Sequence, residues 1–184
     1  MGSLTLLIGG ARSGKSDLAV QIGERHERSL DPASPTVTFI ATAQRFDDDM
    51  DNRINRHRAE RPPWPTIEEP LALDAALALT PDDSLAIIDC LTLWVSNAML
   101  AEWPDTDTEM AAARFARLAA DRGGPTVVVT NEVGLGIHPE TDLGRRYRDL
   151  LGRVNRSWAA AADRTLLLVA GRILPLHDPW EFLP

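Results

Sequence analysis

The segment Gly9–Ser16 constrains the fold of this chain more than any other part of the sequence. It reads Gly-Gly-Ala-Arg-Ser-Gly-Lys-Ser and matches the pattern G-x-x-x-x-G-K-[ST] of a phosphate-binding loop. The aliphatic run Leu4–Ile8 precedes it as a buried strand would, and Ser16–Arg25 has the apolar spacing of an amphipathic helix. A chance match in an ordinary turn is the alternative, and the flanking strand and helix argue against it. Backbone N–H groups of such a loop and the following helix N-terminus converge on an anion.

The residue types in and beyond this loop predict a site for a nucleoside triphosphate with Mg²⁺. Lys15 is expected to reach the β- and γ-phosphates, and the Ser16 hydroxyl to bind the metal. Asp89 follows the apolar run Leu85–Ile88, where an acid in such proteins holds Mg²⁺ directly or through water. An Asp that caps the next helix is the alternative, and both roles can hold at once. The expected nucleotide contacts of the loop are Gly9, Gly10, Ala11, Arg12, Ser13, Gly14, Lys15 and Ser16.

Along the rest of the chain, short apolar runs alternate with segments of helical spacing. Strands are expected at Leu4–Ile8, Thr36–Ala41, Ser84–Ile88, Thr126–Thr130 and Thr165–Ala170. Helices are expected at Ser16–Arg25, Asp47–Glu60, Leu91–Ala101, Thr108–Arg122 and Leu143–Ala162, with a surface loop at Glu27–Pro35. This alternation predicts one α/β domain over residues 1–184, P-loop NTPase-like of the RecA type, with a mostly parallel sheet flanked by helices.

Charge and composition exclude several classes of protein. The formal net charge of −8, from 27 acidic and 19 basic residues, disfavours nonspecific binding to nucleic acid. A single cysteine, Cys90, forms no internal disulfide, which suits a reducing compartment. No apolar run approaches the roughly 20 residues that span a bilayer, and the N-terminus lacks a signal-peptide pattern. We therefore expect a cytoplasmic protein without a membrane span.

Three polar segments are further candidates for substrate contacts. His57 lies among four arginines, Arg53, Arg56, Arg58 and Arg61, and a neutral imidazole can attack an α-phosphorus while guanidiniums hold the phosphates. Spacing alone favours the alternative, a solvated helix face. Asn131 and Glu132 follow an expected strand, where they would contact substrate or orient water, or simply form a glycine-rich turn. The arginines of the last helix are typical of a solvated face with ion pairs, although one or two phosphate contacts fit as well: Arg145, Arg146, Arg148, Arg153 and Arg156.

Several further segments occur in a specific order. They are Ile40–Gln44, Asp48–Met50, Arg53-Ile54, His57-Arg58, Arg61-Pro62, Asp89–Trp94, Ser96-Asn97, Thr130–Gly134, Gly152–Asn155 and Ala159–Asp163. Together with Gly9–Ser16 they closely resemble the bifunctional adenosylcobinamide kinase / adenosylcobinamide-phosphate guanylyltransferase family of cobalamin biosynthesis. The resemblance runs from about Leu4 to Leu176.

The resemblance implies two reactions. ATP or GTP phosphorylates the aminopropanol hydroxyl of adenosylcobinamide, and GTP then guanylylates a histidine, which passes GMP to adenosylcobinamide phosphate. His57 is the histidine that matches this role. Further nucleotide contacts would fall on Thr42, Ala43, Gln44, Arg58, Ala59, Glu60, Arg61, Glu68 and Asp89. The resemblance also implies a corrinoid substrate and a homotrimer.

Three alternatives stay open at this point. In the first alternative, the chain is another small-molecule P-loop kinase in which His57 has no catalytic role. In the second, it is a nucleotide-dependent switch or an assembly ATPase. The switch reading needs a partner surface, and no exposed apolar segment stands out in the sequence. The third alternative is a guanylyltransferase without kinase activity, since no residue is a clear general base for the kinase step.

Overall fold

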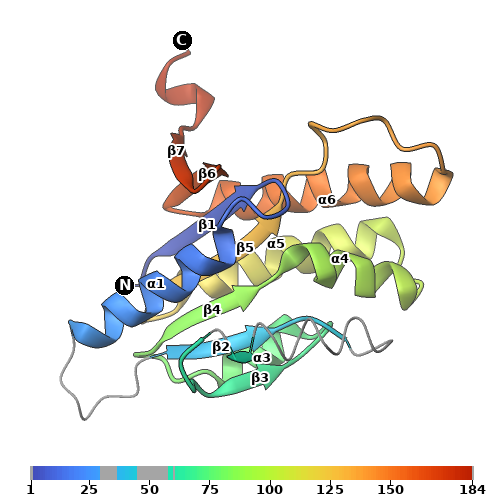
Figure 1. Cartoon of the computed structure of the whole chain (residues 1–184). Coiled ribbons are helices and arrows are strands. Elements are labelled where there is room, and N and C mark those ends of the chain that lie inside the picture. The colour runs from blue at the N-terminus through green and yellow to red at the C-terminus, as the bar shows by residue number, and fades with distance from the viewer. Residues whose placement is uncertain (1, 30–36, 45–57, 60, 184) are drawn as a thin grey trace.

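The computed structural model describes residues 2–29, 37–44, 58–59 and 61–183. A seven-stranded sheet, with strand order β3-β2-β4-β5-β1-β6-β7, forms the centre of the molecule (Figure 1). Its strands are β1 (Leu4–Gly9), β2 (Val37–Ala41), β3 (Thr66–Glu68), β4 (Leu85–Asp89), β5 (Thr126–Asn131), β6 (Arg164–Val169) and β7 (Arg172–Leu176). Neighbouring strands are parallel except β7, which runs antiparallel to β6. The predicted α/β fold with a mostly parallel sheet is confirmed.

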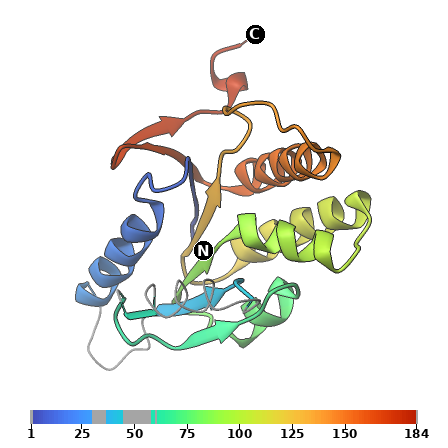
Figure 2. The same ribbon diagram turned by 45° about the vertical axis from the view of Figure 1, so that its right-hand side comes forward.

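Helices cover both faces of this sheet. They are α1 (Lys15–Arg28), α3 (Leu73–Leu79), α4 (Leu91–Leu100), α5 (Asp105–Asp121) and α6 (Asp142–Ala161), followed by the 3₁₀ turn η1 (Pro179–Glu181). Figure 2 shows α1 on one face of the sheet and α3, α4, α5 and α6 on the other. Because parallel strands alternate with helices that return the chain, the carboxyl ends of β1 to β5 meet at one edge of the sheet.

Alternating strand residues divide the core into two parts. Val127 and Val129 of β5 pack with α1, whereas Val128 packs with the helices of the opposite face. The same alternation places Leu85 and Ile87 of β4 on the α1 face. The last residues of β4 and β5, two positions further along each strand, belong to the α1 face as well.

The predicted elements agree with the observed ones to within a few residues, with some exceptions. Glu27 and Arg28 belong to α1, so the surface loop predicted at Glu27–Pro35 begins later than expected. Helix α5 begins at Asp105 rather than Thr108. The sequence patterns missed β3, α3 and β7. Most of the expected helix Asp47–Glu60 lies outside the described residues, of which residues 58 and 59 are helical.

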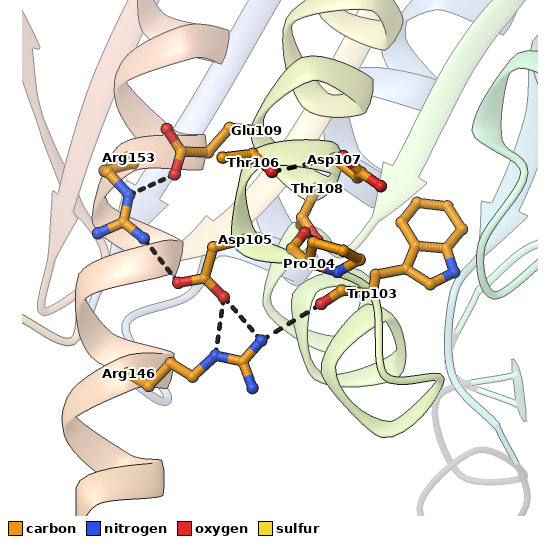
Figure 3. A network of polar contacts seen from close by, with 9 residues as sticks. All are labelled: Trp103, Pro104, Asp105, Thr106, Asp107, Thr108, Glu109, Arg146 and Arg153. Carbon is orange, nitrogen blue, oxygen red and sulfur yellow. Dashed lines mark hydrogen bonds and ion pairs between the residues drawn. The ribbon is translucent and has the colours of Figure 1, made fainter.

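An ion-pair network attaches the start of α5 to α6 (Figure 3). The Asp105 carboxylate accepts from Arg146 Nε at 2.7 Å and from Arg153 Nη2 at 3.0 Å. Arg153 Nε also donates to Glu109 Oε1 at 2.7 Å, and Arg146 Nη2 donates to the Trp103 carbonyl at 3.2 Å. Two of the α6 arginines considered as phosphate ligands are thus engaged in helix packing.

Replacing Asp105 by alanine is expected to lower the free energy of unfolding by about 1 to 2 kcal/mol. Asp105 pairs with two arginines that remain partly exposed, and it also occupies the favourable first turn of α5. Thermal unfolding should therefore shift by about 3 to 6 °C. Asp107→Ala is the matched control, because Asp107 lies in the same turn and forms no ion pair with any arginine among the described residues. Equal shifts for the two variants at low salt would contradict this role of the network.

Candidate functional site

The phosphate-binding loop connects β1 to α1 at the carboxyl edge of the sheet. Gly14 is the N-cap of α1 and has φ 96°, a left-handed conformation that a glycine adopts without strain. Gly9 needs the absence of a side chain, because a Cβ there would lie 2.3 Å from the Leu168 carbonyl oxygen. The backbone therefore requires glycine at both positions of the sequence pattern, at Gly14 because of its conformation and at Gly9 because of the close approach of another backbone segment.

The turn between β6 and β7 supports this loop from outside. Ala170 and Gly171 form the two-residue turn with φ 51° and 71°, as in the tight turns that favour a twisted hairpin. The Gly171 N–H donates to the Ser13 carbonyl at 3.0 Å. The sequence patterns missed β7, which is exposed along its whole length and so lacks the alternation of a half-buried strand.

Lys15 is buried beneath the loop, with 6% of its surface exposed. Its Nζ donates to the Gly10 carbonyl at 2.7 Å and to Ser13 Oγ at 3.3 Å. Burial lowers the pKa of the Lys15 ammonium, and the nearby Asp89 carboxylate acts in the opposite direction. A desolvated ammonium held by neutral oxygens interacts strongly with an incoming anion, since little water remains to be displaced.

Ser16 and Asp89 line one cavity of about 290 Å³ between α1 and the ends of β2 and β4. Asp17, Val20, Gln21, Glu24, Phe39 and Arg61 complete its lining. The structure thus brings together the two residues expected to bind Mg²⁺, which lie far apart in the sequence. Oxygen donors of this type suit a hard cation such as Mg²⁺.

Thr42 fixes the backbone just after Asp89. Its Oγ1 donates to the Cys90 carbonyl at 2.7 Å and accepts from the Cys90 N–H at 2.8 Å. The Thr42 N–H also donates to the Asp89 carbonyl at 3.1 Å, and Asn97 Nδ2 donates to the Thr42 carbonyl at 2.7 Å. Thr42 is fully buried, and its side chain therefore acts on the position of Asp89. Burial, reinforced by Asp89, raises the pKa of the Cys90 thiol to about 12, so this thiol stays neutral at physiological pH.

Arg61 lines the same cavity as Ser16 and Asp89. Its guanidinium lies 3.7 Å from the centroid of the Phe39 ring, and its Nη2 donates to Thr66 Oγ1 at 2.9 Å. Burial and the neighbouring Arg58 lower the pKa of Arg61, whereas Asp89 and Glu68 raise it. A guanidinium stays charged under these influences and offers planar donors to phosphate oxygens.

The other predicted residues are distributed around this edge. Arg58 pairs with Glu68 at the end of β3, with a 3.7 Å distance between two partly exposed side chains. Ala43 and Gln44 follow β2, Ala59 is exposed, and Gly10, Ala11 and Arg12 are exposed in the loop. His57 and Glu60 lie outside the described residues. The lining residues Phe39, Gln21 and Glu24 were missed, because in the sequence they are ordinary members of a strand and a helix.

A family model described as cobinamide kinase / cobinamide phosphate guanyltransferase matches residues 5–176. The bifunctional adenosylcobalamin biosynthesis protein CobP of Pseudomonas aeruginosa is 41% identical over 93% of this chain and 95% of its own. The proteins named CobU from Salmonella typhimurium and Escherichia coli are 41% and 39% identical, each over 91% of this chain and 96% of its own.

A solved structure, the flagellar accessory protein FlaH from Methanocaldococcus jannaschii, overlaps with a TM-score of 0.49 at 17% identity. The overlap covers 94% of this chain and 75% of that one, and it is too distant to inform the function. None of the described helices has the length and apolar character needed to cross a membrane.

Proposed function

Since the chain belongs to the cobinamide kinase / cobinamide phosphate guanyltransferase family, we propose that it phosphorylates adenosylcobinamide and then transfers GMP to the product. The observation that carries the kinase half is the shared cavity of Ser16 and Asp89 beside the buried Lys15. In the first step the aminopropanol hydroxyl oxygen attacks the γ-phosphorus of ATP or GTP. The nucleoside diphosphate leaves and the hydroxyl proton is released.

The described residues fit a nucleoside triphosphate with Mg²⁺. The loop Gly9–Ser16 offers backbone N–H groups, Lys15 offers a charge, and the Ser16 hydroxyl and Asp89 carboxylate would hold the cation. Bound there, Mg²⁺ would neutralise charge that develops on the phosphate oxygens. Lys15 would exchange its bond to the Gly10 carbonyl for one to a phosphate, without moving from a buried position.

The second step uses His57 as the nucleophile. An imidazole nitrogen attacks the α-phosphorus of GTP, and pyrophosphate leaves. A phosphate oxygen of adenosylcobinamide phosphate then attacks the guanylyl phosphorus, which forms adenosylcobinamide-GDP and frees the imidazole. His57 directly precedes Arg58 in the sequence, and Arg58 pairs with Glu68 at the same edge of the sheet as Asp89. Ala43, Gln44 and the segment from Arg58 to Arg61 would hold the nucleotide for this step, whereas Thr42, expected as a nucleotide contact, is fully buried and would position the neighbouring backbone instead.

The two steps place different phosphorus atoms at the reacting centre. The kinase step needs the γ-phosphorus next to the acceptor, whereas guanylylation needs the α-phosphorus next to His57. We therefore propose that GTP binds differently in the two steps, or that the segment carrying His57 moves between them.

We also propose a homotrimer in the cytoplasm whose contacts include the C-terminal segment. The expectation of no exposed apolar segment is wrong, because Ile173, Leu174, Trp180 and Phe182 are all more than half exposed. They lie on an edge strand and the tail after it, where an uncovered apolar surface favours association. Light scattering of the wild-type protein and of a Leu174→Lys, Trp180→Lys double variant measures the mass. A wild-type monomer at micromolar concentration would contradict the trimer.

Labelled nucleotides test the proposed function directly. The purified protein is incubated with Mg²⁺, adenosylcobinamide and GTP that carries the label at either the α- or the γ-phosphate. We expect γ-label on the corrinoid, and in the absence of corrinoid an acid-labile, base-stable α-label on the protein. Transfer of γ-label without any α-adduct would leave a plain kinase, and the reverse would leave a guanylyltransferase without kinase activity. Neither transfer, with nucleotide binding intact, would contradict both activities.

A further inference from the structure

Strand β5 lies between the strand that leads into the phosphate-binding loop and the strand that ends in Asp89. The register pairs Gly9 with Asn131 and Asp89 with Val129. Asn131 therefore stands level with the first residue of the phosphate-binding loop, between that loop and the acidic end of β4. This is the one strand end in the described sheet that separates the two halves of the expected triphosphate site.

The alternation along β5 places the Asn131 side chain on the nucleotide-binding face. Val127 and Val129 pack on the α1 side of the sheet, so Asn131 points to that side too. Asp89 occupies the same face and lines the cavity with Ser16. The Asn131 amide therefore lies on the face of the sheet that carries α1 and the Asp89 side chain, level with the start of the phosphate-binding loop.

The backbone of Asn131 is held on both sides. Its N–H donates to Thr92 Oγ1 at 2.8 Å, and its carbonyl accepts from Asn155 Nδ2 at 3.0 Å. Asn155 is nearly buried and also accepts from Thr130 Oγ1 at 2.7 Å. The next N–H, of Glu132, donates to the Gly9 carbonyl at 3.0 Å and so connects Asn131 to the phosphate-binding loop.

The side-chain amide of Asn131 takes no part in these bonds. Within the described part of the chain, the hydrogen bonds of Asn131 are made by its main chain. The neighbouring Glu132 is different, because its carboxylate accepts from the Gly134 N–H and is used within its own loop. A rigid backbone with an uncommitted donor in its side chain is the arrangement that a preorganised phosphate contact requires.

We propose that Asn131 Nδ2 donates a hydrogen bond to the transferred γ-phosphoryl group in the kinase step, with Thr92 and Asn155 as its positioning residues. The inference rests on the proposed function. Negative charge on the three equatorial oxygens of that group has to be stabilised during transfer. A neutral amide donor does so without placing a second negative charge beside the Asp89 carboxylate. The guanylyl step reacts at the α-phosphorus, so it depends less on Asn131.

The test compares Asn131→Ala and Asn131→Asp with the wild-type enzyme in both half-reactions. We expect kcat for phosphorylation of adenosylcobinamide to fall about 10²-fold in Asn131→Ala, as for the loss of one preorganised donor, and at least as far in Asn131→Asp. The KM for GTP and the rate of α-adduct formation should change by less than about 3-fold. Thr92→Val removes the acceptor for the Asn131 N–H and should lower the same kcat while the adduct still forms.

Two results would overturn the proposal. One is an unchanged kcat for phosphorylation in Asn131→Ala. The other is a parallel fall in both half-reactions together with weaker GTP binding, which indicates a structural role only. Thermal unfolding of each variant checks that the fold is intact. If the wild-type enzyme does not phosphorylate adenosylcobinamide, the proposed function fails. The role of Asn131 is then tested by the rate of GTP hydrolysis in water. A matching loss of this rate in Asn131→Ala would support the role, and an unchanged rate would overturn it.

Discussion

Replacing Lys15 by alanine is expected to lower kcat/KM for the phosphorylation of adenosylcobinamide by about 10³-fold or more. The ammonium is buried and already held at the loop by Gly10 and Ser13, so a bound phosphate meets it without reorganisation. Burial lowers its pKa because the charge has lost water, and a triphosphate beside it would restore a favourable environment. The measurement is steady-state transfer of γ-label, with nucleotide affinity determined separately.

A matched control removes a positive charge from the same helix. Arg28 is the exposed last residue of α1, roughly 20 Å along the helix from Lys15, and Arg28→Ala should leave both reactions within about 2-fold of wild type. Lys15 is also the only lysine in the sequence, so a reagent for amines modifies only this side chain and the N-terminus. GTP should protect Lys15 from that reagent. Full activity in Lys15→Ala, or equal modification with and without GTP, would contradict the assigned contact.

Replacing His57 by alanine is expected to abolish the α-labelled adduct while phosphorylation of adenosylcobinamide persists. The covalent step needs a nucleophile that alanine lacks, whereas the γ-phosphoryl transfer depends on the loop, Lys15, the cation site and Asn131 and uses no histidine. Formation of adenosylcobinamide-GDP should fall below about 10⁻³ of the wild-type rate. The chain has three other histidines, His26, His138 and His177, which allows the assignment to be tested by elimination.

His138→Ala is the control for this variant, because His138 is exposed in the loop after β5. It should form the adduct at the wild-type rate. An adduct that survives in His57→Ala would place the nucleophile elsewhere and remove the guanylyl-histidine assignment. Loss of both activities in His57→Ala, with GTP binding unchanged, would show that the two steps share this residue, contrary to the separation proposed above.

The residues that sequence patterns identified share a local character. The loop Gly9–Ser16 lies between one strand and one helix, and its glycines, lysine and serine are consecutive or nearly so. Turn chemistry and helix N-termini depend on neighbouring residues, which is why the motif predicts both its own structure and its ligand. Long buried strands and amphipathic helices were recognised for the same reason, since their periodicity repeats within one segment.

The missed elements lack such a local signal. Strand β3 has three residues and α3 has seven, which is too short for periodicity to be distinguished from chance. Strand β7 is exposed throughout, so its residues do not alternate between core and solvent. The turn at Ala170-Gly171 supports the phosphate-binding loop through a bond to Ser13, a contact between distant segments that no pattern in either segment records.

The sequence alone therefore predicts the phosphate-binding loop, the alternation of strands and helices, and the acid at the end of β4. The folded chain adds the order of the strands, which inserts β5 between Gly9 and Asp89 and brings Asn131 to the site. The folded chain also brings Thr42 into hydrogen bonds with the Cys90 backbone and places the Arg61 guanidinium over the Phe39 ring. The physical reason is range: propensity and periodicity act over a few residues, whereas strand pairing and side-chain packing join segments whose separation along the chain carries no local trace.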